Sequence, residues 1–234
     1  MLLSYGKKVS VSSSLEGYPA ENIVDEDART AWVAQSNRDM EWAQVDLQRL
    51  SSIHAIQVNF DEYGANQKGA VSGVYQSYLI YASVNGEDWS LVVDYGTKKT
   101  DTPHDYIEFE EPFKARYIKL QNKEYMVSEN FSVRDLRIFG KGQGSTPRAV
   151  NDFTVERDEA DPCKARLCWE AVPDAQGYIV RYGIAGDKLY NNFQVMGENI
   201  LEIGSLNKGV AYYFTIDAYN ENGITRTSRI KVCR

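Results

Sequence analysis

The stretch Tyr78-Leu-Ile-Tyr-Ala-Ser-Val-Asn-Gly-Glu-Asp-Trp89 decides the fold class. Residues 78–84 are aromatic and β-branched or aliphatic at the positions expected of a strand. Asn85-Gly86 then follows, and this dipeptide is the strongest short signal for a tight turn between two strands. The segment therefore predicts a strand that ends in a tight turn.

The same pattern repeats on both sides of this segment. Ile56, Val58 and Phe60 alternate with polar residues, as expected of a half-buried strand. Further strands are predicted at 106–109, 116–120 and 136–139. The one predicted helical turn lies around Pro19 to Ile23, with proline near its start. Many short strands separated by turns predict an all-β sandwich or barrel.

The segment Lys141-Gly-Gln-Gly-Ser-Thr-Pro147 interrupts the strand pattern with small and breaker residues, which is the composition of a linker. Alternation then restarts at Leu167, Trp169 and Ala171 and continues through residues 178–182 and 212–218. We therefore expect two domains, at residues 1–143 and 144–234.

Composition excludes several classes of function. The net charge of −7 argues against nucleic-acid binding and against attraction to anionic membranes. No apolar run is long enough to span a membrane, and Met1 to Leu3 is too short for a secretory signal. The chain is expected to be either cytoplasmic or a piece of a longer secreted protein. The 3 cysteines, Cys163, Cys168 and Cys233, permit at most one internal bridge, and their pairing stays open.

Five landmarks give the first 140 residues a resemblance to the discoidin family, which includes coagulation-factor C-type domains and family 32 carbohydrate-binding modules. The landmarks are the segments 19–32, Trp42-Ala-Gln-Val-Asp-Leu47, 81–89, Ala115-Arg-Tyr-Ile-Lys-Leu120 and Asp135-Leu-Arg-Ile-Phe-Gly140. The resemblance implies a galactose-binding-like jelly-roll sandwich over residues 1–143. It implies less about the ligand, because the family binds sugars, lipid headgroups and proteins.

Residues 144–234 resemble a fibronectin type III domain, an immunoglobulin-like sandwich. Leu167-Cys-Trp169 and Gly177-Tyr-Ile-Val-Arg-Tyr182 match two of its strands, and Leu206 with Tyr212 matches its tyrosine corner. The order of the two modules, with the phrase Thr102-Pro-His-Asp-Tyr-Ile-Glu108, resembles the C-terminal region of bacterial family 43 glycoside hydrolases. That resemblance implies an upstream catalytic domain of the xylosidase or arabinosidase type.

A short acidic loop is the candidate metal site. Asp25, Asp27 and Thr30 place oxygen-bearing side chains at close spacing, with Asn22 just ahead. Such oxygens suit Ca²⁺, but the same residues also form turns that hydrogen-bond their own backbone. The family resemblance implies a structural calcium here, with Asp135 as a late acidic ligand. Glu26 departs from the glycine usual in the family.

The tryptophans are all expected in the two cores: Trp32, Trp42 and Trp89 in the first domain and Trp169 in the second. Sugar stacking would then fall to tyrosines. The candidate carbohydrate site consists of the loops 33–40, 61–68 and 122–130. Planar polar groups would come from Gln35, Asn37, Arg38, Asn66 and Asn130, and apolar ring faces from Tyr63 and Tyr125. Each residue alone could also be an ordinary solvated loop residue.

No catalytic constellation is predicted. His104 lies beside Asp105, but a relay also needs a nucleophile and an oxyanion site, so a turn or the start of a strand is the better interpretation of His104. A carboxylate pair of the glycosidase kind is not excluded by sequence, yet the two folds leave no residues for a catalytic domain.

The preferred hypothesis is a non-catalytic carbohydrate-binding fragment of a secreted multidomain glycoside hydrolase, which targets the enzyme to polysaccharide or oligosaccharide. The expected location is extracellular, periplasmic or at the cell surface. The alternative is a structural or protein-interaction module that positions a neighbouring catalytic domain without binding sugar. Membrane adhesion through apolar loop tips ranks last, since only Met40, Val71, Val74, Met126 and Val127 are available.

Overall fold

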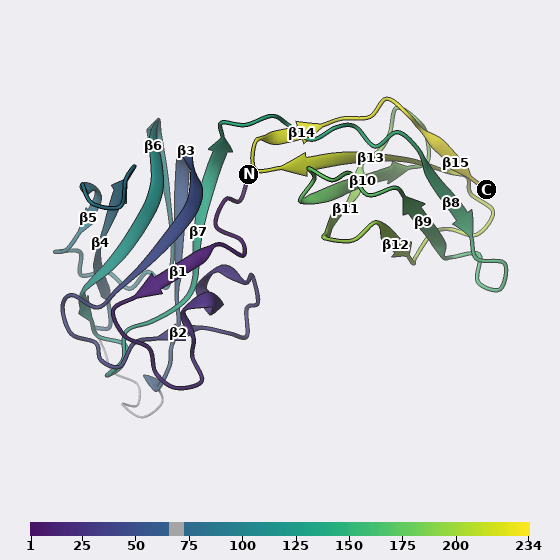
Figure 1. The fold of residues 1–234 in the computed structure, drawn as a ribbon. Coiled ribbons are helices and arrows are strands. Elements are labelled where there is room, and N and C mark those ends of the chain that lie inside the picture. The colour runs from purple at the N-terminus through teal and green to yellow at the C-terminus, as the bar shows by residue number, and fades with distance from the viewer. Residues whose placement is uncertain (66–72) are drawn as a thin grey trace. The chain divides into compact units, whose positions relative to one another are not determined.

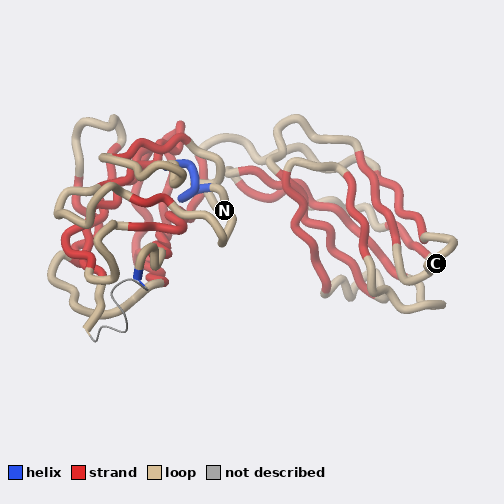
Figure 2. Tube along the Cα trace, turned by 90° about the horizontal axis from the view of Figure 1, so that it is seen from below, coloured by secondary structure: helices blue, strands red, loops and turns tan. Residues whose placement is uncertain are grey.

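The computed structural model describes residues 1–65 and 73–234. The chain divides into two compact units, Met1–Gln143 and Gly144–Arg234, and each is described by itself. Strands dominate both units, and helix is confined to short turns (Figure 2). The all-β prediction is confirmed.

In the first unit, a single connected sheet runs in the order β2-β7-β3-β6-β4-β5, with β1 paired to β3 (Figure 1). The elements are β1 (Lys8–Val11), the 3₁₀ turn η1 (Ala20–Val24), β2 (Trp32–Val33), β3 (Trp42–Phe60), β4 (Gln76–Ser83), β5 (Ser90–Tyr95), β6 (His104–Tyr125) and β7 (Ser132–Gly142). The helical turn predicted after Pro19 is therefore confirmed, and His104 is the first residue of a strand as predicted.

Two long strands, β3 and β6, fold this sheet into two layers. Residues 42–46 of β3 pair with β1 and with residues 117–121 of β6. After a register shift, residues 51–60 of β3 pair with β7 and with the first half of β6. Gln48 lies at this bend with a φ of 68°. The bend lets both halves of each long strand face a common core.

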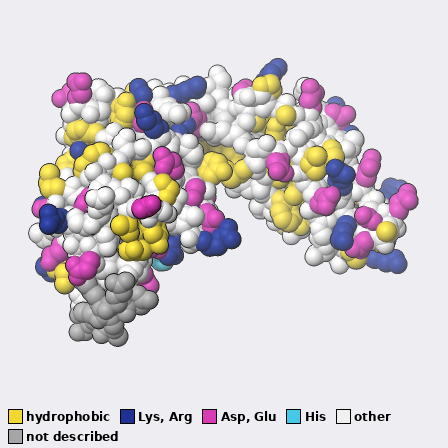
Figure 3. All heavy atoms as spheres, turned by 60° about the horizontal axis from the view of Figure 1, so that its bottom comes forward, with side chains coloured by type: hydrophobic (Ala, Val, Ile, Leu, Met, Phe, Trp, Pro, Cys, Tyr) yellow, Lys and Arg dark blue, Asp and Glu magenta, His cyan; other side chains and the backbone are white. Residues whose placement is uncertain are grey.

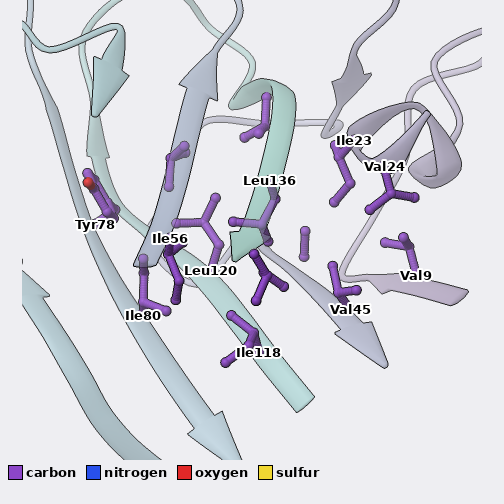
Figure 4. Close-up of a cluster of buried hydrophobic side chains, with 14 of the residues drawn as sticks. Val9, Ile23, Val24, Val45, Ile56, Tyr78, Ile80, Ile118, Leu120 and Leu136 are labelled. Atoms are coloured by element: carbon purple, nitrogen blue, oxygen red, sulfur yellow. The ribbon is translucent and has the colours of Figure 1, made fainter. Parts of the chain in front are cut away.

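The core of the first unit is aliphatic with a few aromatic rings. Labelled side chains from β1, η1, β3, β4, β6 and β7, such as Val9, Ile23 and Leu136, point toward one another (Figure 4). Along β3, Ala43, Val45 and Leu47 are buried while the residues between them are half-buried. This period of two is the physical signature of a strand with one face on the core.

The second unit is a separate β-sandwich. One sheet runs β11-β10-β13-β14 with β15 paired to β13, and the other runs β12-β9-β8. The strands are β8 (Phe153–Arg157), β9 (Ala165–Trp169), β10 (Gly177–Gly183), β11 (Asn191–Met196), β12 (Ile200–Ile203), β13 (Tyr212–Asn220), β14 (Gly223–Thr225) and β15 (Lys231–Cys233). Its core contains Trp169, which meets Tyr178 edge-on at 5.1 Å between ring centroids. The backbone N–H of Asn207 donates to the Tyr212 hydroxyl at 3.3 Å.

The expected burial of all four tryptophans is wrong for two of them. Trp32 and Trp169 lie in the cores, but Trp42 and Trp89 are only half-buried and belong to neither core. Trp42 shares the outward phase of β3 with Gln44 and Asp46, because the inward positions are Ala43 and Val45. Trp89 follows the turn after β4, and the Lys119 ammonium lies 4.1 Å from its ring centroid. The outer surface of the first unit therefore carries indole rings.

Two sequence questions are addressed by the same structure. Among residues 1–65 and 73–234, no helix combines the length and apolar character needed to cross a bilayer. Cys163, Cys168 and Cys233 are all free thiols. Burial raises the pKa of the Cys233 thiol, which keeps it protonated and poorly reactive.

Candidate ligand-binding loops

Four chain segments meet at the end of the first unit where β3 begins and β6 ends. The segment 12–18 is tied to the segment 33–41 by the Leu15 N–H, which donates to the Val33 carbonyl at 2.7 Å. The segment 126–131 joins them through the Ala34 N–H, which donates to the Phe131 carbonyl at 2.8 Å. The segment 61–65 leaves β3 at the same end. Loops from distant parts of the sequence thus form one surface.

Glu41 anchors this loop cluster. Its carboxylate accepts hydrogen bonds from the hydroxyls of Ser12, Ser13 and Ser36, of which the last two are 2.8 and 2.7 Å long. Partial burial opposes ionisation of Glu41, but these three hydrogen bonds and the nearby charge of Arg38 together lower its pKa. An ionised Glu41 therefore joins the two segments at neutral pH.

Two of the predicted sugar-binding amides are hydrogen-bonded within the loops. The Asn37 side-chain amide donates to the carbonyls of Ser128 at 2.8 Å and Tyr125 at 3.3 Å. The Asn130 amide donates to the Ala34 carbonyl at 2.9 Å. Both N–H donors of Asn37 and one of the two of Asn130 are therefore used within the loops.

The prediction that Tyr125 offers a ring face is wrong. Its side chain is 2% exposed and packs against Phe60 and Phe131 in the core. Its hydroxyl donates to the Asp61 carbonyl and lies 3.2 Å from the Ser132 hydroxyl. Burial raises the pKa of Tyr125 well above its ordinary value. This tyrosine holds the 61–65 segment from beneath.

The accessible chemistry comes from Arg38, Gln35 and a tyrosine pair. Arg38 is exposed, and its guanidinium makes no hydrogen bond or ion pair with any residue that the structure describes. Gln35 is exposed and donates one weak bond, at 3.3 Å, to the Ser14 carbonyl. Tyr63 is half-buried and meets the ring of Tyr18 edge-on at 4.9 Å. The predicted contact Asn66 lies outside the described residues.

Sequence reasoning missed one member of this surface, Tyr18. Tyr18 reaches the site because the Ser14 hydroxyl bonds its carbonyl at 2.7 Å and so closes the segment 14–18 into a turn. A tyrosine between Gly17 and Pro19 in a polar loop was the signal that could have found it. Met40, the last residue of the predicted loop 33–40, is 64% exposed at the edge of the same loops.

The acidic loop after η1 closes on itself. The Asp25 carboxylate accepts from the Asp27 N–H and from the Thr30 hydroxyl, each at 2.8 Å. Asp27 forms a two-bonded ion pair with the exposed Arg29, and its pKa falls to about 2 because of that partner. The Asn22 amide donates to the Ala31 carbonyl. The sequence allowed two interpretations of this loop, a metal site and a turn that hydrogen-bonds its own residues. The hydrogen bonds described here are those of such a turn.

One observation on the neighbouring strand β7 still fits a cation. Asp135, on β7, is 4% exposed; one carboxylate oxygen accepts from the Asn59 amide at 2.8 Å, and the other has no hydrogen-bond partner in the described structure. Arg137, two residues further on the same face of β7, reaches the loop and pairs with Glu26. In the described part of the chain, no group of three or more acidic, histidine or cysteine side chains converges on a metal position. A Ca²⁺ ion would therefore need Thr30 and backbone carbonyls beside Asp25 and Asp135, which is a donor set this ion accepts.

The histidine beside Asp105 does not take part in a relay. The His104 ring contacts the Asn59 side chain at 3.1 Å. Asp105 instead accepts from the Tyr78 hydroxyl at 2.8 Å and forms an ion pair with Lys98 at 2.6 Å. These side chains stabilise the junction of β4 with β6 rather than forming a nucleophile and base.

The first unit is a β-sandwich with a cluster of loops from distant parts of the sequence at one end. Residues 8–135 match the model of the F5/8 type C domain, which covers more than half of the chain. The chain belongs to the F5/8 type C domain family.

Two curated relatives match over 110 residues, or 44% of this chain. Lactadherin of Rattus norvegicus is 33% identical and lactadherin of Mus musculus is 32% identical. The aligned part is 25% of the rat protein and 23% of the mouse protein, so the chain spans about a quarter of the length of these relatives.

Solved structures match the same fold. Chitosan-binding module 1 from a chitosanase/glucanase of Paenibacillus sp. IK-5 superimposes with a TM-score of 0.51 at 20% identity, over 60% of this chain and 99% of that module. Module 2 of that enzyme, solved in complex with chitotriose, gives a TM-score of 0.50 at 19% identity, over 59% of this chain and 99% of that module. At these identities the likeness shows the fold.

Proposed function

We propose that the first unit is a non-catalytic carbohydrate-binding module whose site is the loop surface around Arg38. The observation that carries the proposal is the accessible guanidinium of Arg38 and amide of Gln35 on the same loop surface as the Tyr18–Tyr63 pair. A planar guanidinium and an amide can bond adjacent hydroxyls of a sugar, and a tyrosine ring can cover its C–H face. The solved modules of the same fold that carry chitosan-binding names support this proposal.

Binding would be an equilibrium without chemical turnover. An exposed surface of this kind excludes little water, so each contact adds modestly and the affinity for a single sugar is low. A module attached to a catalytic domain raises the effective concentration of that domain at a polysaccharide. The mechanism needs a surface that keeps its shape, which Glu41, Asn37 and Asn130 provide.

The test is calorimetric titration of the chain with defined glycans: xylohexaose, cellohexaose, chitohexaose and polygalacturonate. Binding of at least one probe at millimolar concentration is expected. Because a hydrogen bond from a charged group contributes about 1.5–3 kcal/mol, Arg38→Ala should weaken the affinity roughly tenfold or more. Arg148→Ala, which removes an exposed arginine of the second unit, is the matched control. Absence of any binding by the unmodified chain would refute the proposal.

A second candidate function is a positioning module that contacts a neighbouring catalytic domain and binds no sugar. The internal use of the Asn37 and Asn130 amides favours it, because two expected sugar ligands are committed to structure. Under this alternative, the unmodified chain and Arg38→Ala both give titrations without heat of binding for every glycan.

The second unit and the wider context complete the proposal. The Asn207–Tyr212 hydrogen bond and the buried Trp169 support a fibronectin type III-like sandwich that acts as a spacer. We place the chain in the C-terminal region of a secreted glycoside hydrolase of the family 43 type, with the catalytic domain upstream and the chain outside the cytoplasm. On the face seen in Figure 3, acidic side chains are interspersed among the basic ones, which suits a neutral glycan better than nucleic acid.

We propose Ca²⁺ as a structural ion at the acidic loop, held by Asp25, Thr30 and Asp135. The unpaired, buried oxygen of Asp135 supports it. The ion would stabilise the loop beside η1 and would take no part in sugar recognition.

A further inference from the structure

The outer face of the layer formed by β1, β3, β6, β4 and β5 carries an unusual set of side chains for a solvated sheet. Gln44 lies directly opposite Lys119, and Lys119 lies directly opposite Tyr81, so the three form a row across β3, β6 and β4. These strands lie side by side in Figure 1. Leu91 of β5 extends the row beyond Tyr81 and is exposed.

Aromatic rings border this row. The Lys119 ammonium lies 4.1 Å from the ring centroid of Trp89 and 5.2 Å from that of Tyr81. Trp42 stands on the same face of β3 as Gln44. All of these rings are half-buried, and none belongs to the core. The face therefore presents apolar rings beside polar groups.

The polar side chains of the row receive no hydrogen bond or ion pair from the residues that the structure describes. Gln44 and Tyr81 form no side-chain hydrogen bond with any described residue, and Lys119 forms no ion pair with a carboxylate in that part of the chain. Burial lowers the pKa of Lys119, since its ammonium is partly removed from water without an anion beside it. A ligand with hydroxyl or carboxylate oxygens would supply the missing acceptors.

This face is continuous with the loop surface. The Gln121 amide, on the same face of β6 as Lys119, contacts the Met40 sulfur at 3.2 Å. Lys123, next on that face, forms an ion pair with Asp39 at 2.6 Å. The loop that carries Arg38 therefore ends on the outer face. Trp42 lies two residues after Met40 in the sequence and is the first residue of β3.

We propose that the outer face extends the loop site, and that the ligand is a linear oligosaccharide whose further sugars lie across Trp42, Gln44, Lys119 and Tyr81. The inference rests on the proposed function, because the first sugar is placed at Arg38. Neighbouring groups on this face are about 5 Å apart across strands and about 7 Å apart along them, so a chain of several sugars meets successive polar and aromatic groups.

The experiment measures affinity against chain length, with xylose, cellobiose and chitobiose beside the three hexasaccharides. The unmodified chain should bind a hexasaccharide roughly tenfold or more tightly than the short sugar of the same series, since the added sugars contact further rings and polar groups. Gln44→Ala, Tyr81→Ala and Lys119→Met should each reduce that gain roughly threefold and leave the short sugar unaffected. Lys114→Met and Tyr106→Ala, exposed positions elsewhere on β6, are the controls.

The outcomes separate the two proposals. If Arg38→Ala loses binding while all three outer-face variants bind hexasaccharides like the unmodified chain, the extended site is refuted and the loop function stands. If the outer-face variants lose binding and Arg38→Ala does not, the loop function is refuted and the ligand lies on the sheet alone. Equal affinity for short and long sugars also overturns the extension. Circular dichroism of each variant confirms that the fold is kept.

Discussion

The carboxylate of Glu26 forms two hydrogen bonds with the guanidinium of Arg137, at 3.0 and 2.6 Å, although Glu26 has a φ of 61°. A residue other than glycine in this left-handed region costs about 1 kcal/mol. The ion pair joins the acidic loop to β7, 111 residues away in sequence, and is partly shielded from solvent. Glutamate therefore occupies a glycine-like position because its side chain has a distant partner.

This arrangement predicts that Glu26→Ala is less stable than Glu26→Gly. Both variants lose the ion pair, but only alanine keeps the backbone strain, so the free energies of unfolding should differ by about 1 kcal/mol. Urea denaturation of both variants measures the difference. When Arg137 is also replaced by alanine, Glu26→Ala should still be less stable than Glu26→Gly. If the two Glu26 variants are equally stable with and without Arg137, the backbone at this position is unstrained.

Calcium should raise the thermal stability of the chain. An ion held by Asp25 and Asp135 binds only the folded state, and at 100 times its dissociation constant it contributes about 2.7 kcal/mol. Melting in calcium chloride is compared with melting in EDTA, with magnesium as the control ion. Asp135→Asn should abolish the shift. An identical melting temperature in calcium and EDTA would leave the self-bonded turn as the whole explanation of this loop.

Glu41 should make the loop surface sensitive to acid. Its pKa in the folded state lies below the ordinary value of 4.5, so its contribution to stability is fully present above about pH 4.5 and is lost as the pH falls through the lower folded pKa. Glu41→Gln should therefore be less stable than the parent at pH 7, and the gap should narrow under acid. Unfolding of both proteins across this pH range checks the sign, and a gap that widens in acid contradicts it.

Tyr125→Phe tests whether this residue supports the loops or contacts sugar. Loss of a buried hydroxyl that donates to the Asp61 carbonyl should cost about 1 kcal/mol of stability. Glycan affinity, measured where the variant is fully folded, should stay within twofold of the parent. A large loss of glycan affinity without loss of stability would show instead that Tyr125 contacts the sugar.

The strands were predictable because their pattern is local. Alternation in β3 and β4, the Asn85-Gly86 turn and the proline before η1 follow from side-chain periodicity and backbone sterics. The same rule places Trp42 outside, in phase with Gln44, but the size and apolar character of the side chain favoured the core. Periodicity was the better guide at that position.

The binding surface was less predictable, because hydrogen bonds between distant segments decide which loop side chains are accessible. Asn37 and Asn130 carry the same amide as Gln35, yet carbonyls from other loops engage the first two more strongly. No local pattern distinguishes these cases. Tyr125 and Tyr63 differ in the same way, since the burial of each ring depends on which side chains the folded chain brings next to it.

The passage of β3 and β6 through both layers has an evolutionary consequence. Two continuous backbones carry the hydrogen bonding from one layer to the other, so the scaffold does not rely on the loops for its integrity. Insertions, deletions and exchanges at the loop end can therefore accumulate at little energetic cost. A family built on such a scaffold can change what it recognises far faster than it changes its architecture.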